Sequence, residues 1–142
     1  MSAEVTAGGR VAMITGASAG IGRSLAVKLA RDGWQVAVCA RREAALRSIA
    51  EDHPDIADRL HVYPLDVTDV ADSQALFMAV EARVGEVDTL LPNAGDYAPM
   101  PLDAFDSEIF QRLITVHSLR CLNVLAAALR SIRRPGAAPA LF

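Results

Sequence analysis

The chain contains little that would tie it to a disulfide scaffold, a membrane or a nucleic acid. It has only two cysteines, Cys39 and Cys121, with the spacing of neither a metal site nor a disulfide framework, so we expect reduced, packed thiols. No apolar run approaches membrane-spanning length, and the first six residues lack the charged-then-apolar order of a signal peptide. The formal net charge of -3 leaves little basic surface for a phosphate backbone. We therefore expect a cytoplasmic protein that binds neither membrane nor nucleic acid.

What the chain does contain is a regular alternation of apolar runs and helical patterns. Its composition, 52% apolar and 22% charged, is typical of one globular domain, to which we assign residues 1–142. The alternation is typical of an α/β protein with a parallel sheet between helices. The predicted strands cover residues 10–15, 34–40, 60–65 and 87–91, with 138–142 as a fifth strand that has barely begun. The predicted helices cover about 21–31, 43–51 ended by Pro54, a third capped by Asp69 or Asp72 and ended at Gly85, and 107–132.

The last of these helices, over residues 107–132, is apolar on more than one side. One set of side chains is expected to face the sheet: Phe110, Ile114, Cys121 and Leu125. A second set lies elsewhere around the axis: Leu113, Leu119, Leu122 and Leu129. A helix with two apolar stripes usually needs two neighbours, so the pattern favours a homo-oligomer formed through this helix.

The first strand breaks into a glycine-rich turn, TGASAGIG over residues 15–22, that leads into a helix. Free backbone N–H groups at a helix N-terminus favour an anion such as a pyrophosphate. Gly16 would allow the tight turn, Gly20 and Gly22 would let phosphate approach, and Ser18 could donate to it. The plainer interpretation is a loop that needs glycines only for its turn.

Two arginines, Arg41 and Arg42, follow the second strand, where a cofactor with a free ribose 2′-hydroxyl would require an acid. A guanidinium can bind the 2′-phosphate of NADP with two hydrogen bonds, so the sequence favours NADP(H) over NAD(H). Arg41 is the stronger candidate, because Arg42 is equally typical of a solvated residue at a helix start.

Two further candidates follow the third and fourth strands. Asp66 is placed to meet the edge of a base, with Val67 as an apolar contact for the ring, although Asp66 is nearly as typical of a turn or a helix cap. The turn Asn93-Ala94-Gly95 could bring backbone close to the ribose on the nicotinamide side, but alone it predicts only a turn.

Together, the glycine turn, the step Leu65-Asp66-Val67 and the turn Asn93-Ala94-Gly95 resemble the short-chain dehydrogenase/reductase family, from about Arg10 to Phe142. The resemblance implies a Rossmann-type, doubly wound parallel sheet and an oxidoreductase that moves hydride between NADP and a small-molecule alcohol or carbonyl. It further implies the cofactor-binding set: Gly16, Ser18, Gly20, Ile21 and Gly22 at the pyrophosphate, Arg41 with Arg42 at the 2′-phosphate, Asp66 and Val67 at the adenine, and Asn93, Ala94 and Gly95 at the ribose. By the same resemblance, the long helix contributes to a dimer or tetramer interface.

The sequence departs from the family at the acid/base group. Family members use a Ser and a Tyr-x-x-x-Lys pair after the fifth strand. Here Tyr63 and Tyr97 are followed four residues later by Val67 and Pro101, and the single lysine is Lys28. We therefore expect no turnover by this chain alone.

His117 falls, by the resemblance, where the family carries an Asn that supports a proton-relay water. A neutral imidazole could exchange a proton near pH 7, whereas the alternative is a histidine packed between helix and sheet. His117 and Cys121 lie four residues apart, but two ligands without a third do not predict a metal site. Pro92, where the family commonly has an Asn, removes a backbone donor.

Two functions remain open at this point. The first is an NADP-dependent reductase whose sheet is truncated after the fourth strand and long helix, so that the domain is incomplete at its C-terminus. The second is a non-catalytic NADP-binding or regulatory module that needs a partner chain. A third possibility, a different phosphate ligand, would make Arg41 and Asp66 coincidences.

Overall fold

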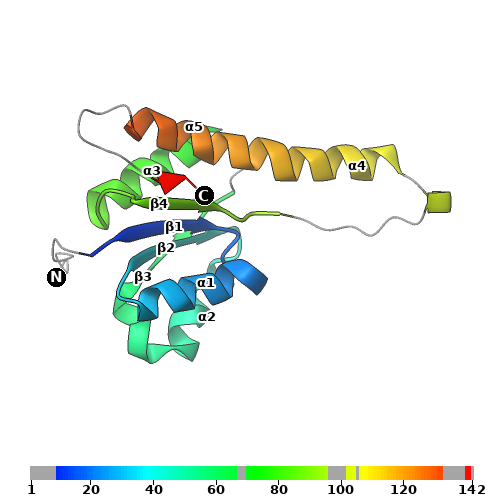
Figure 1. Ribbon diagram of the computed structural model, residues 1–142. Coiled ribbons are helices and arrows are strands. Elements are labelled where there is room, and N and C mark those ends of the chain that lie inside the picture. The colour runs from blue at the N-terminus through cyan, green and yellow to red at the C-terminus, as the bar shows by residue number, and fades with distance from the viewer. Residues whose placement is uncertain (1–8, 67–69, 96–101, 105, 133–139, 142) are drawn as a thin grey trace.

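The computed structural model describes residues 9–66, 70–95, 102–104, 106–132 and 140–141. They form a parallel sheet in the order β3-β2-β1-β4-β5 (Figure 1). The strands are β1 (Val11–Thr15), β2 (Gln35–Ala40), β3 (Leu60–Pro64), β4 (Thr89–Pro92) and β5 (Ala140–Leu141). The α/β class and the parallel sheet predicted from the alternation are confirmed, and the beginning of a fifth strand pairs with β4.

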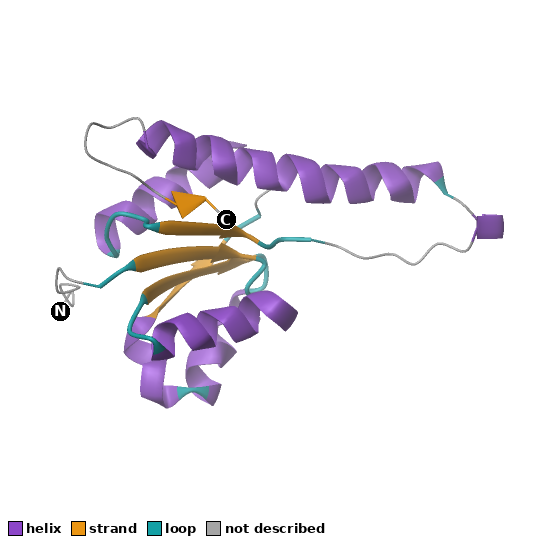
Figure 2. Ribbon diagram, in the orientation of Figure 1, coloured by secondary structure: helices purple, strands orange, loops and turns teal. Residues whose placement is uncertain are grey.

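Helices cover both faces of this sheet (Figure 2). α1 (Gly20–Arg31) and α2 (Glu43–Asp52) lie on one face, and α3 (Val70–Arg83) and α5 (Arg120–Ile132) lie on the other. The predicted end of the second helix near Pro54 is correct. The chain then continues as a 3-10 helix over Pro54–Arg59, because proline is tolerated in a first helical turn, where its missing N–H costs nothing.

The strands are buried on both sides, so their alternating side chains supply two cores. Met13 of β1 packs into the core under α3 and α5, whereas its neighbour Ile14 packs into the core under α1 and α2. Every residue of β1 is buried. This central strand therefore fixes the two layers of helices relative to each other.

β4 begins two residues later than predicted. The carboxylate of Asp88 accepts a hydrogen bond from the Val11 N–H at 2.7 Å, and the Asp88 N–H donates to the Val11 carbonyl at 2.9 Å. These two bonds join the segment before β4 to the start of β1. The strand then extends to Pro92, one residue beyond its predicted end.

The long predicted helix is continuous, but it contains a π-helical turn, Thr115–Leu119, between α4 (Ser107–Ile114) and α5. The expectation that Phe110 and Ile114 face the sheet is wrong, since their side chains are 45% and 49% exposed. A π-turn advances the chain by less than 100° per residue and so shifts the phase of the helix that follows. The face that packs on the sheet is made by Val124, Ala127 and Ala128.

Candidate functional site

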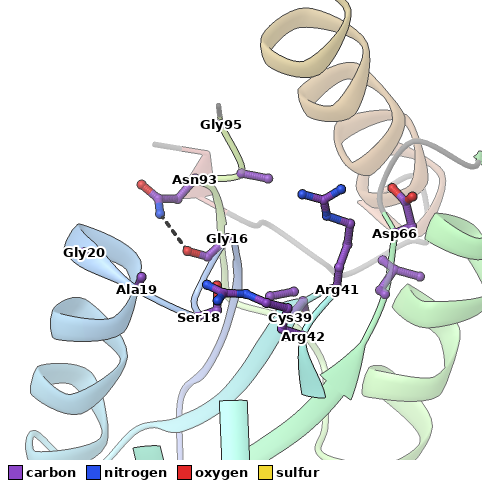
Figure 3. Close-up of a pocket in the computed structure, with 13 residues that line it drawn as sticks. Gly16, Ser18, Ala19, Gly20, Cys39, Arg41, Arg42, Asp66, Asn93 and Gly95 are labelled. Atoms are coloured by element: carbon purple, nitrogen blue, oxygen red, sulfur yellow. Dashed lines mark hydrogen bonds between the residues drawn. The ribbon is translucent and has the colours of Figure 1, made fainter. Parts of the chain in front are cut away.

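A cavity of about 410 Å³ lies at the carboxyl ends of the strands, where ligands of open parallel sheets bind (Figure 3). Its walls come from the segments after β1, β2, β3 and β4, four parts of the chain that are distant in sequence. The lining residues are Gly16, Ser18, Ala19, Gly20, Cys39, Ala40, Arg41, Arg42, Leu65, Asp66, Asn93, Ala94 and Gly95. The structure thus brings together most of the residues predicted to bind a cofactor, while Val67 lies outside the described residues.

The glycines of the turn have different surroundings. Gly20 has φ +59°, and a Cβ on it would meet no atom within 4 Å, so this side of the turn is open. A Cβ on Gly16 would lie 2.6 Å from the Asn93 carbonyl oxygen, and one on Gly22 would lie 2.5 Å from Asn93 Nδ2. Gly22 does not line the cavity. Gly16 and Gly22 therefore permit the close approach of Asn93, and Gly20 faces the open space.

Two side chains tie the glycine turn to the turn after β4. The buried Thr15 hydroxyl accepts hydrogen bonds from the N–H groups of Asn93 and Ala94 at 3.1 and 3.3 Å. The Asn93 side-chain amide donates to the Gly16 carbonyl at 3.2 Å. Thr15 belongs to the motif that predicts the glycine turn, but the motif predicts no role for its hydroxyl. The available signal was a polar side chain at the end of an otherwise apolar strand.

The N-terminus of α1 points its first-turn N–H groups toward the cavity side of the glycine turn. The N-cap residue Ala19 offers no side-chain acceptor, and the first turn carries no acidic residue. These N–H groups are those that a helix cannot satisfy internally, and the helix dipole adds partial positive charge at the same place. Ile21 lies in this turn with 78% of its surface exposed. The arrangement suits an anion.

Arg41 and Arg42 line the cavity from a second segment, between β2 and α2. Both are exposed, and within the described part of the chain neither guanidinium forms an ion pair. In Figure 3 the side chains of Arg41 and Arg42 extend from the end of β2. Asp66 lies at the end of β3. Guanidinium groups bind phosphate through paired N–H donors, so this wall complements a second anionic group.

The cavity is also lined by Cys39, which is predicted from the sequence only as a packed thiol. Burial raises the pKa of the Cys39 thiol to about 12. The thiol is therefore neutral, and its fully buried side chain belongs to the core under α3 and α5. No sequence signal distinguished Cys39 from the other buried residues of β2.

His117 lies in the π-turn, against the turn after β4. A Cβ on Gly95 would be 2.8 Å from His117 Cε1, so the imidazole lies directly over the Gly95 backbone. His117 is exposed, which contradicts the interpretation that it is packed between helix and sheet. Among the described residues, no group of three His, Cys, Asp or Glu side chains could hold a metal ion.

This cavity is not lined by Tyr63 or Lys28, the described tyrosine and lysine of the chain. Tyr63 lines a separate hollow between β3 and α3, where burial raises the pKa of its phenol. The ammonium of Lys28 is exposed and pairs with Asp32 at 2.8 Å. Tyr97 lies outside the described residues.

Among the described helices, none is long and apolar enough to cross a bilayer.

Comparison with known proteins agrees with this geometry. A family model described as short chain dehydrogenase matches residues 10–138. An uncharacterized oxidoreductase of Listeria innocua is 33% identical over 122 residues, which are 86% of this chain and 49% of that protein. A gluconate 5-dehydrogenase from Burkholderia cenocepacia, solved with NADP and tartrate, is 35% identical with a TM-score of 0.76, over 87% of this chain and 49% of that one. A variant of the actinorhodin polyketide ketoreductase, solved with NADPH, is 30% identical with a TM-score of 0.79, over 87% and 47% of the two chains.

The chain spans about half the length of the relatives that it matches. The match covers the glycine turn, the acidic step after β3 and the turn after β4, which are three of the four segments that line the cavity. The chain belongs to the short-chain dehydrogenase family.

Proposed function

We propose that this chain binds NADP(H) in the cavity at the ends of β1, β2 and β4, as the cofactor-binding part of an oxidoreductase. One observation carries the proposal: one cavity is lined both by the turn at the uncapped N-terminus of α1 and by Arg41 and Arg42, whose guanidinium groups form no ion pair among the described residues. NADP carries two anionic groups, its diphosphate and its 2′-phosphate. A cofactor with a single anionic group would leave one wall without a function.

The residues present fit that cofactor. The open side of Gly20 and the N–H groups around Ser18 would receive the diphosphate, with Ile21 beside it. Arg41 and Arg42 would bind the 2′-phosphate. Asp66, followed by Val67, would lie at the adenine, and the turn formed by Asn93, Ala94 and Gly95 would border the other ribose. When bound, the cofactor supplies hydride transfer.

The first test is nucleotide selectivity. Arg41→Ala should weaken NADPH binding by roughly 10-fold to 100-fold, because a hydrogen bond to a charged group contributes about 1.5–3 kcal/mol, and it should leave NADH binding almost unchanged. Fluorescence titration of both nucleotides measures this, with Arg42→Ala alongside to divide the effect between the two arginines. Equal affinity of the unmodified chain for NADPH and NADH would refute the assignment.

We further propose that this chain binds cofactor without turning it over. It contains no Tyr-x-x-x-Lys pair, and the described polar groups of the cavity would bind the two anionic groups of the cofactor. Hydride exchange with a small-molecule alcohol or carbonyl is then an activity of an oxidoreductase of which this chain is the cofactor-binding part. The alternative is a non-catalytic or regulatory module that acts with a partner chain. Appreciable carbonyl-dependent oxidation of NADPH by the 142-residue chain would contradict both.

His117 is a candidate for acid/base support in that whole oxidoreductase. Its imidazole lies over Gly95, which lines the cavity, so it stands at the end proposed for the nicotinamide ribose. There it would hold a proton or a water molecule near the reacting group.

The location in the cytoplasm that we expect from the sequence stays a prediction.

We also propose that a second copy of the chain covers the long helix. The large exposed apolar residues of this helix are Phe110, Ile114, Leu122 and Leu129. At about 100° per residue, Phe110 and Ile114 share one side of α4, and Leu122 and Leu129 share one side of α5. The π-turn between them rotates the chain by less than 100° per residue. It therefore brings the two pairs closer together around the helix axis, so that they form one narrower apolar stripe.

Light scattering tests the oligomer. Phe110→Glu should shift a dimer toward monomer by placing a charge in a desolvated interface. Met78→Glu is the control, because Met78 is 65% exposed and belongs to α3 rather than to the long helix. A protein that is monomeric before substitution would overturn the proposal.

A further inference from the structure

Arg23 joins the two helices that border the two proposed anion-binding ends of the cavity. It lies in the first turn of α1, directly after the glycine turn, yet every partner of its guanidinium is on α2. Nη1 donates to the Ala45 carbonyl at 3.2 Å and to Ser48 Oγ at 2.9 Å. Nη2 donates to the Ser48 carbonyl at 3.4 Å and pairs with the Asp52 carboxylate. One side chain therefore contacts α2 along most of its length.

The second helix of this pair carries the arginines that face the cavity. Arg42 is the N-cap residue of α2, and its carbonyl accepts a hydrogen bond from the Leu46 N–H at 3.3 Å. Arg41 directly precedes it. The two arginines therefore connect the end of β2, which the sheet holds, to the start of α2, and Arg23 fixes the position of α2 relative to α1.

We propose that Arg23 is a positioning residue for selectivity toward a 2′-phosphorylated cofactor: it holds the start of α2 at a fixed distance from the glycine turn. This inference rests on the proposed function. A nucleotide whose diphosphate is held at α1 and whose 2′-phosphate is held at α2 binds best when that span is set in advance, because ordering it on binding costs affinity. A nucleotide without the 2′-phosphate uses only the α1 end.

The contact does more than hold α2 on the protein, because α2 has an apolar attachment of its own. Leu46 and Ile49 are fully buried in the core shared by α1, α2 and the sheet. The Arg23 side chain is 25% exposed and Asp52 is 62% exposed, so the ion pair alone adds little to stability. What Arg23 contributes is the planar fork that matches several acceptors at once.

The test is the ratio of the affinities for NADPH and NADH, measured by fluorescence titration of the full chain. Arg23→Met should raise the Kd for NADPH by about three- to tenfold and leave the Kd for NADH within about twofold. Arg23→Lys should recover only part of the ratio, because one ammonium cannot reach both Ala45 and Asp52 as a fork does.

Arg31→Met is the matched control. Arg31 lies on the same helix and pairs with Asp55 in the 3-10 helix after α2, through a side chain that is 54% exposed. It should leave both affinities unchanged. If Arg23→Met does not fold, as judged by thermal unfolding, Ser48→Ala combined with Asp52→Asn removes partners of the same contact from the α2 side.

Two results would overturn the inference. One is an equal loss of affinity for both nucleotides, which would make Arg23 a merely structural residue, and the other is an unchanged affinity for NADPH in a folded Arg23→Met variant. The proposed function fails separately: an unmodified chain without preference for NADPH over NADH refutes the 2′-phosphate site itself. A chain that has the preference and keeps it in Arg23→Met refutes only the role of Arg23.

Discussion

Two glycines with positive φ allow ligand contact to be separated from backbone strain at the scale of one residue. Gly20 and Gly33 have φ +59° and +90°, and a Cβ on either meets nothing within 4 Å. Gly20→Ala and Gly33→Ala should therefore each cost about 1–2 kcal/mol of stability through strain alone. Only Gly20 lines the cavity, so only Gly20→Ala should also weaken NADPH binding. Thermal unfolding and nucleotide titration of both variants test this, and a similar binding loss in Gly33→Ala would argue against phosphate contact at Gly20.

The two thiols should differ in their response to pH. Burial raises the pKa of Cys39 to about 12 from an ordinary 9.0, whereas Cys121 is only partly buried. A raised acid pKa in the folded state means that stability is constant below about pH 9 and falls as pH rises toward 12, because the unfolded thiol ionises first. The unfolding free energy attributable to Cys39 should thus drop by about 2 kcal/mol between pH 8 and about pH 10.5.

Urea unfolding of the unmodified chain and of Cys39→Ala at both pH values isolates that contribution. Alkylation gives an independent reading: at pH 8, Cys121 should react in the folded protein, and Cys39 only after unfolding. Rapid alkylation of both thiols in the folded chain would contradict the burial of Cys39.

At the scale of elements, Thr15 joins the two turns that close the cavity. Thr15→Val keeps the shape of the side chain but removes the acceptor of the Asn93 and Ala94 N–H groups. It should cost about 1–3 kcal/mol, since partly buried donors lose their partner. Thr15→Ser restores the hydroxyl and should recover most of the loss in urea unfolding. If Thr15→Val is as stable as the unmodified chain, water replaces the hydroxyl and the junction is not a determinant of the fold.

The helices mark the limit of prediction from sequence at this scale. α1, α2 and α3 were predicted from apolar spacing and end signals, because one α-helical period holds through each of them. The last helix breaks that period at residues 115–119, so the expected faces of Phe110 and Ile114 were wrong although the helix itself was predicted. A constant period cannot anticipate a π-turn, whose cause lies in packing between distant elements.

At the scale of the whole molecule, the position of the site was predictable and its internal contacts were not. Parallel strands place their carboxyl ends at one edge, so Gly16, Arg41 and Asn93 were expected to meet there, and they do. Other contacts depend on side-chain packing between elements: that of Gly22 with Asn93, that of Cys39 with the cavity, and that of Arg23 with α2. Spacing along the chain carries no information about such contacts.

The strand order β3-β2-β1-β4-β5 also has a kinetic consequence. β1, β2 and β3 can assemble from the first half of the chain, but the cavity gains its last wall only when β4 returns to the free edge of β1, which brings Thr15 beside Asn93 across 78 positions of sequence. Such long-range closure is the slow part of folding a sheet of this kind. A nucleotide that contacts all of the walls can bind only after β4 has docked. The time at which nucleotide binding begins during refolding therefore reports when β4 docks on β1.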